Sequence, residues 1–146
     1  MTTVADILKS KGHGSVHTIG PDASVFDALQ RMADQSIGAL LVVKGEAIAG
    51  IVTERDYARK IALKGRTSAL TEVRDVMTLE VVCVQPTQTT EECMALMTDR
   101  RLRHLPVVDN GRLVGMVSIG DLVKHIISAQ RFVIEQMGQY ISGQHS

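Results

Sequence analysis

The chain lacks a net charge, closely spaced cysteines and a long apolar run. Sixteen basic side chains balance sixteen acidic ones, so the positive footprint expected of a nucleic-acid-binding surface is missing. Cys83 and Cys93 form no Cys-x-x-Cys pair and have no His at ligand spacing, which argues against zinc and predicts two buried, reduced thiols. Residues 37–43 are apolar, but a bilayer span needs about 20 residues. The N-terminus has no apolar signal-peptide stretch, so we expect a cytoplasmic chain.

Catalytic motifs are also missing. His104, His125, Asp109 and Asp121 are the side chains from which an acid–base centre could be assembled, but no motif ties a nucleophile to a base and an orienting group. We therefore expect a protein that is not an enzyme and holds no metal.

A heptapeptide occurs twice in the sequence. Gly-Ile-Val-Thr-Glu-Arg-Asp at residues 50–56 is matched by Gly-Met-Val-Ser-Ile-Gly-Asp at residues 115–121. The Gly, the hydroxyl residue and the Asp are each repeated at an offset of 65 positions, and the same offset aligns residues 16–61 with residues 81–126 without a gap. A fixed period of this kind is typical of a repeated supersecondary unit. The chain is therefore a duplication.

Each copy predicts the element order β-α-β-β-α, which places the protein in the α+β class. The first copy has an extended segment at 16–19, a helix after Ser24, strands at 37–43 and 47–52, and a helix from Thr53. The second has strands at 81–84, 102–108 and 113–117, with an Asn-Gly hairpin turn between the last two. Apolar positions predict a lead-in helix at residues 4–8, and residues 73–77 repeat them.

The hydroxyl residue at the end of each second hairpin strand begins a helix. Helix N-termini offer backbone N–H groups and the positive end of the helix dipole, which favour a phosphate. An Asp three residues on lies on the same side, and its carboxylate can accept hydrogen bonds from both hydroxyls of a ribose. This combination suits a nucleotide. The same Thr/Ser-x-x-Asp pattern is also a capping box, in which the Asp binds only its own helix start; the sequence leaves both interpretations open.

Two copies of Leu-x-Val-Val or Leu-Pro-Val-Val, a turn and Gly-x-Val-Thr/Ser-x-x-Asp resemble a tandem pair of cystathionine β-synthase (CBS) domains of the free-standing bacterial type. The resemblance covers residues 4–127. It implies two β-α-β-β-α repeats related by pseudo-twofold symmetry in one disc-like module. It also implies a regulatory, energy- or redox-sensing role, with an adenosine nucleotide bound in clefts between the copies. AMP is the favoured ligand, with ADP, ATP or NAD as alternatives; because the chain has no Rossmann or Walker motif, binding would rest on the repeats alone.

The resemblance also implies which residues bind the ligand. The junction residues that would hold phosphate and ribose are Thr53, Asp56, Ser118 and Asp121. Backbone groups for the adenine edge would come from Gly38, Ala39, Leu40, His104, Leu105 and Pro106, and the base would be flanked by Thr18, Ile19, Val82 and Val84. Basic side chains match family positions near the phosphates at Arg103 and His104. The copies differ beside the Asp, where Arg55 in the first is replaced by Gly120 in the second, so the two sites need not be equally filled.

We assign residues 1–66, with the lead-in helix, to the first repeat, residues 67–128 to the second and residues 129–146 to a C-terminal helical extension. An apolar stripe runs along the last helix through Leu122, Ile126, Ala129, Val133, Met137 and Tyr140. The stripe predicts either a contact surface, for a homodimer or a regulated partner protein, or a tail folded back on its own domain. The alternative function is an interaction scaffold that dimerises through helices and has no physiological nucleotide.

Overall fold

The computed structural model describes residues 2–12 and 16–143, which form two compact units. One unit is Ser15–Cys83; the other combines Met1–Gly14 with Val84–Ser146. The spatial units therefore differ from the repeats as we divided them in the sequence. The lead-in segment of the first repeat belongs to the unit built by the second repeat, and residues 67–83 belong to the unit built by the first.

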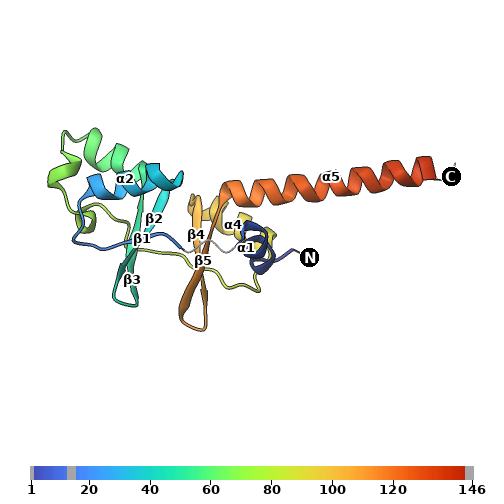
Figure 1. Cartoon of the computed structure of the whole chain (residues 1–146), viewed down its shortest axis with the longest axis horizontal. Helices are drawn as coiled ribbons and strands as arrows, with labels where there is room; N and C mark the ends of the chain where they lie inside the picture. The colour runs from blue at the N-terminus through green and yellow to red at the C-terminus, as the bar shows by residue number, and fades with distance from the viewer. Residues whose placement is uncertain (1, 13–15, 144–146) are drawn as a thin grey trace. The chain divides into compact units, whose positions relative to one another are not determined.

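The unit Ser15–Cys83 has the predicted order β-α-β-β-α (Figure 1). Its elements are β1 (Thr18–Ile19), α2 (Val25–Gln35), β2 (Ala39–Lys44), β3 (Ala47–Thr53) and α3 (Glu54–Tyr57), which continues into a π-helical turn, Ala58–Ala62. The sheet order is β1-β2-β3, with β1 parallel and β3 antiparallel to β2. The Ser24 hydroxyl caps α2 by accepting a hydrogen bond from Asp27 N–H, which confirms the predicted helix start.

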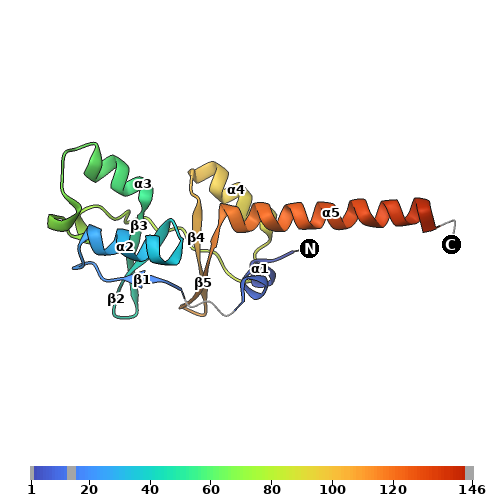
Figure 2. The ribbon, with the colours of Figure 1, turned by 45° about the horizontal axis from the view of Figure 1, so that its top comes forward.

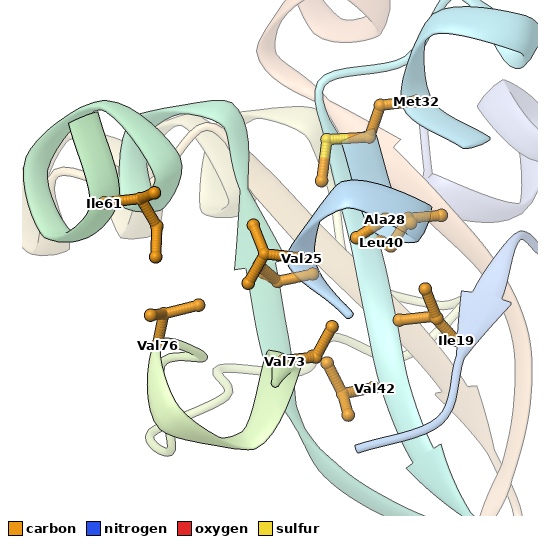
Figure 3. Close-up of a cluster of buried hydrophobic side chains, with 10 residues drawn as sticks. Ile19, Val25, Ala28, Met32, Leu40, Val42, Ile61, Val73 and Val76 are labelled. Atoms are coloured by element: carbon orange, nitrogen blue, oxygen red, sulfur yellow. The ribbon is translucent and has the colours of Figure 1, made fainter. Parts of the chain in front are cut away.

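A core of buried aliphatic side chains holds this unit together. Ile19 from β1, Met32 from α2 and Leu40 from β2 are each at most 3% exposed. Figure 3 shows them together with Val73 and Val76, which follow the π-helical turn in the chain and complete the cluster. Burial of an aliphatic side chain of this size contributes about 1.5–3 kcal/mol. Residues 73–76 are therefore part of the core of the first repeat.

The second unit consists of α1 (Val4–Lys11), α4 (Thr90–Arg100), β4 (His104–Asp109), β5 (Arg112–Ser118) and α5 (Ile119–Gly143) (Figure 2). The predicted strand at 81–84 is wrong, since only a bridge between Val84 and Val107 is present. In the first copy Leu41 N–H donates to the His17 carbonyl, but the equivalent of Leu41 is Pro106, which has no N–H to extend the parallel ladder.

The β4–β5 hairpin reproduces β2–β3 residue for residue. Ala39 pairs with Thr53 and His104 with Ser118, and the register shifts at Val42/Val43 and again at Val107/Val108. Asn110 and Gly111 both have positive φ, 52° and 80°, as a two-residue hairpin turn requires. The Asn-Gly hairpin prediction is confirmed.

The second lead-in segment is not the predicted helix. It forms two 3-10 turns, Ser68–Leu70 and Val73–Asp75. Its backbone bonds to the start of α2, with Val25 N–H donating to Thr71 and Val73 N–H donating to Ala23, as the start of α1 bonds to the start of α4. The lead-in helix prediction holds for α1 alone.

The two cysteines differ in exposure. Cys93 is buried as predicted, but Cys83 is exposed, and that prediction is wrong because Cys83 lies in an irregular segment instead of a strand. Burial, with a smaller effect of the Glu92 charge, raises the pKa of the Cys93 thiol. No helix in the described part of the chain is both long and apolar enough to cross a membrane.

Candidate functional site: the paired strand-to-helix junctions

Each repeat carries a junction where the second hairpin strand becomes a helix. β3 ends at Thr53 and β5 at Ser118, and the next residue begins α3 or α5. The first helical N–H donates to the carbonyl of the residue just before the neighbouring strand: Glu54 to Gly38 at 3.1 Å and Ile119 to Arg103 at 2.9 Å. The central strand, the junction hydroxyl and the helix start are therefore fixed together in both copies.

At the first junction the Asp56 carboxylate is fully engaged. Its Oδ2 accepts from Thr53 N–H at 2.9 Å and from the Thr53 hydroxyl at 3.1 Å. Its Oδ1 lies 3.1 Å from Lys60 Nζ and 3.4 Å from the Thr78 hydroxyl. Asp56 is only 8% exposed. This is the capping-box arrangement, with a lysine and a threonine added to it.

At the second junction the hydrogen bonds to the Asp121 carboxylate all reach one oxygen, Oδ2. Asp121 Oδ2 accepts from Ser118 N–H and from Lys11 Nζ, both at 2.8 Å, and the same ammonium donates to the Met116 carbonyl at 2.9 Å. Within residues 2–12 and 16–143, no hydrogen bond reaches Asp121 Oδ1. The Asp121 side chain is 21% exposed, so this oxygen retains acceptor capacity that Asp56 has lost.

The surroundings of Asp121 favour its ionised form. Burial alone would raise the pKa of Asp121, but hydrogen bonds from Lys11 and from Ser118 N–H, together with the Lys11 charge, lower it. Burial lowers the pKa of His104, which faces Ser118 across the hairpin, and the charges of Arg103 and Lys11 lower it further while that of Asp121 opposes them. The Asp121 carboxylate, the Lys11 ammonium and the His104 imidazole therefore influence one another at this junction.

The capping pattern by itself does not identify a ligand site. Thr3 and Asp6, outside the repeated heptapeptide, form the same reciprocal cap at the start of α1. That pair does not lie at the end of one of the strands β1–β5, and the other copy has no equivalent cap. Asp6 likewise accepts hydrogen bonds through Oδ2 alone. The second junction differs from that cap in the Lys11 ammonium bound to Asp121 and in its place at the end of β5.

The residues predicted to contact the base and sugar are distributed over both units. The unit Ser15–Cys83 contains Thr18, Ile19, Gly38, Ala39, Leu40, Thr53, Arg55, Asp56 and Val82; the other contains Val84, Arg103, His104, Leu105, Pro106, Ser118, Gly120 and Asp121. Several of the backbone groups are already used within the fold. The Pro106 carbonyl accepts from Val84 N–H at 2.9 Å, and the Gly38 carbonyl accepts from Glu54.

The sequence interpretation missed the two lysines. Lys60 follows Asp56 by four residues, a spacing that brings side chains together on a helix, so this contact had a local signal. Lys11 lies 110 residues before Asp121 in the chain, and no sequence pattern links them. Among the described residues no group of three His, Cys, Asp or Glu side chains is arranged to hold a metal ion.

The duplicated β-α-β-β-α unit, with a capped junction in each copy, defines a tandem α+β module. The CBS domain model matches residues 4–63 and 73–128, and the chain belongs to the CBS-domain family. CBS-domain proteins are commonly regulatory, nucleotide-sensing modules.

Solved structures and a curated relative are similar over most of the chain. A protein with CBS domains from Burkholderia ambifaria MC40-6 is 55% identical with a TM-score of 0.85, over 88% of this chain and 96% of that one. The CBS domain structure NE2398 is 52% identical with a TM-score of 0.82, over 87% and 99%. The mitochondrial CBS domain-containing protein CBSX3 of Arabidopsis thaliana is 45% identical, over 97% of this chain and 73% of its own length.

Proposed function

We propose that this chain is a non-catalytic regulatory module that binds an adenosine nucleotide, with AMP as the first candidate and ADP, ATP or NAD as alternatives. The observation that carries the proposal is the unused Oδ1 of Asp121 at the start of α5, beside the Ser118 hydroxyl and the Lys11 ammonium. Family membership supports the ligand class, and the junction supports the position.

The chemistry of the second junction matches a ribose phosphate. An ionised carboxylate accepts strong hydrogen bonds from sugar hydroxyls, and Asp121 can do so through Oδ1 while Oδ2 keeps the cap and the lysine. Lys11 binds this carboxylate directly, and the charges of Lys11 and Arg103 both act on the neighbouring His104, so the two cations would attract a phosphate to this region.

The first junction is proposed as the weaker site. Asp56 would have to give up Lys60 or Thr78 before Oδ1 could accept a ribose hydroxyl, and loss of one hydrogen bond from a partly exposed donor costs about 0.5–1.5 kcal/mol. Arg55, which is exposed on the first turn of α3, offers a cation that the second copy lacks. We therefore expect unequal affinities at the two junctions.

The expected affinity is that of a sensor. Charge-assisted hydrogen bonds contribute about 1.5–3 kcal/mol each, and association costs an estimated 4–15 kcal/mol in rigid-body freedom. A few such bonds and a partly buried adenine leave roughly −6 to −8 kcal/mol, which corresponds to tens of micromolar down to micromolar. Occupancy in this range follows the nucleotide concentration.

Titration calorimetry of the full chain with AMP, ADP, ATP and NAD tests the proposal. We expect heat of binding with at least one of them, and roughly a 10- to 100-fold loss of affinity in Asp121→Asn, the equivalent of one charge-assisted hydrogen bond. Asp56→Asn should affect the stronger site less. Asp109→Asn, at an exposed Asp at the end of β4, is the matched control. Absence of heat with all four nucleotides contradicts the proposal.

The engaged state of Asp56 favours a second candidate function, a scaffold whose junctions serve only as helix caps. In that case Asp121→Asn would lower the free energy of unfolding without changing the heat with any nucleotide. Prolonged incubation with ATP should leave the nucleotide intact under either function; turnover would indicate an enzyme instead.

A further inference from the structure

The Lys60 side chain joins the first junction to the segment that follows the π-helical turn. Its Nζ lies 3.1 Å from Asp56 Oδ1 and donates to the Val76 carbonyl at 2.7 Å. The Thr78 hydroxyl reaches the same Asp56 oxygen at 3.4 Å. One carboxylate oxygen therefore ties the junction to residues 76–78, and Lys60 makes the shorter of the two contacts to that oxygen.

Beyond these contacts, residues 76–78 are held by one buried side chain and one pair of backbone bonds. Val76 lies with Ile61 of the π-helical turn in the buried cluster of this unit (Figure 3). Thr78 N–H donates to the Ile51 carbonyl at 2.8 Å, and Ile51 N–H donates to the Thr78 carbonyl at 3.0 Å. Residues 79–83 then form no helix or strand. A change at Asp56 Oδ1 is therefore passed directly to the last ordered part of this unit.

The second copy has no lysine at the equivalent position. Lys60 lies inside the π-helical turn Ala58–Ala62, a rare form of helix that occurs frequently at functional sites. The offset of 65 positions makes residues 123–127 the equivalent stretch, which is regular α-helix within α5 and has His125 in place of the lysine. In that copy no hydrogen bond from the described residues reaches Asp121 Oδ1. The π-helical turn, the lysine and the occupied oxygen thus occur together in one copy.

The ammonium of Lys60 has an advantage over a ribose hydroxyl as a partner of Asp56. A hydrogen bond between two ionised groups is stronger than one between a carboxylate and a neutral hydroxyl. The lysine also belongs to the same chain, so its contact costs no rigid-body freedom, whereas association of a nucleotide does. The Lys60 side chain is 41% exposed, so it can leave Asp56 for solvent without unfolding of the unit.

We propose that Lys60 is an internal competitor of the nucleotide at the first junction, and that its displacement releases residues 76–78 from Asp56. This inference rests on the proposed function, because competition requires that Asp56 receive a ribose. A lysine that only attracts phosphate would have the opposite effect, since its removal would weaken the binding of an anion. Removal of a competitor strengthens binding, and the sign of the effect therefore separates the two roles.

Titration calorimetry with AMP, ADP, ATP and NAD tests the competition in the full chain carrying Asp121→Asn, which weakens the second junction. Adding Lys60→Met, which keeps an unbranched side chain and removes the ammonium, should tighten binding about 10-fold, the equivalent of one charge-assisted hydrogen bond. Adding Asp56→Asn as well should abolish the gain. Lys64→Met, at an exposed lysine just after the π-helical turn, is the matched control and should give no gain.

Hydrogen exchange tests the release of the segment. A bound ligand generally slows exchange because it stabilises the fold. Here a saturating nucleotide should instead speed exchange at Met77 and Thr78 in the Asp121→Asn protein. In the protein that also carries Lys60→Met, these amides should already exchange faster without nucleotide. If Lys60→Met does not unfold cooperatively in urea, Lys60→Gln, which retains a donor for the Val76 carbonyl, takes its place in both measurements.

The outcomes separate this inference from the proposed function. Wild-type binding that Lys60→Met weakens or leaves unchanged at the first junction overturns the competitor role and leaves the proposed function intact. A gain that survives Asp56→Asn, or exchange at residues 77–78 that a saturating nucleotide slows, overturns it as well. Absence of heat in the wild type and in every variant overturns both proposals.

Discussion

At the scale of single residues, the two junction aspartates have the same sequence context and different hydrogen bonding. Asp56 divides its partners over both oxygens, whereas Asp121 places the cap and the lysine on Oδ2 alone. Two contacts make the difference. Lys60, four residues after Asp56, and the Thr78 hydroxyl both occupy Oδ1 of Asp56, whereas Lys11 reaches Oδ2 of Asp121 from α1. The copy with the distant lysine is the one that retains an oxygen for a ligand.

The Lys11–Asp121 pair predicts a pH-dependent contribution to stability. Lys11 is 44% and Asp121 21% exposed, so solvent screening limits their coupling at pH 7 to about 0.5–1 kcal/mol. Because the folded pKa of Asp121 is lowered, the coupling is present above the unfolded value of about 3.9 and is lost as the pH falls through the folded pKa. A double-mutant cycle with Lys11→Met and Asp121→Asn, followed by urea unfolding between pH 7 and 3, measures it.

The control for this cycle is Lys9→Met, since Lys9 is an exposed lysine of the same helix. A Lys9–Asp121 coupling as large as that of Lys11, or a Lys11–Asp121 coupling that does not decline between pH 7 and pH 3, would contradict the ion pair as described.

The local part of the site could be predicted from the sequence, and the long-range part could not. Ser or Thr followed by Asp three residues on predicts a helix cap, which is present at Thr53 and Ser118. Whether the carboxylate has acceptor capacity left depends on Lys11 and Thr78, whose approach follows from tertiary packing. The exposure of Cys83 was not predicted for a related reason. The strand expected at residues 81–84 does not form, because a proline in β4 has no N–H with which to extend the ladder.

At the scale of elements, the recurring glycine of the repeat has a packing role. A Cβ at Gly50 would lie 2.7 Å from the Thr78 carbonyl oxygen, and a Cβ at Gly115 would lie 2.6 Å from a Leu8 methyl group. Each lead-in segment therefore passes closely over a hairpin strand at the glycine. The sequence showed the recurrence, but not that the glycine makes room for a segment far away in the chain.

These contacts predict different costs for the same substitution. Gly50→Ala meets backbone that is fixed by the hydrogen bond from Ile51 N–H to the Thr78 carbonyl, so we expect a loss of about 1–3 kcal/mol in the free energy of unfolding. Gly115→Ala meets the end of a leucine side chain, which can rotate, so its loss should be smaller. Urea unfolding of both variants measures the difference; an equal or larger loss for Gly115→Ala would show that Leu8 is held as firmly as the backbone.

At the scale of the whole molecule, each lead-in segment completes the unit of the other repeat. α1 joins β4, β5 and α5, and residues 67–83 join β1, β2 and β3. The duplication could be predicted from the 65-residue offset and the α+β class from the element order of each copy, but the grouping of the lead-in segments could not. A repeat in sequence fixes which residues are equivalent, whereas the partner of a lead-in segment is decided by which apolar surface it covers.

This exchange predicts a crossed pattern of destabilisation. Val4 and Val73 are equivalent lead-in residues, both valines and both 0% exposed, so Val→Ala at either should cost about 2 kcal/mol. Each compact unit can open locally as one cooperative unit. Val4→Ala should therefore speed hydrogen exchange in β4 and β5, and Val73→Ala should speed it in β2 and β3. Peptide-level exchange measured on both variants checks this, with each variant as the control for the other. If Val4→Ala instead loosened β2 and β3, the lead-in segments would stabilise the repeats to which they belong in the sequence.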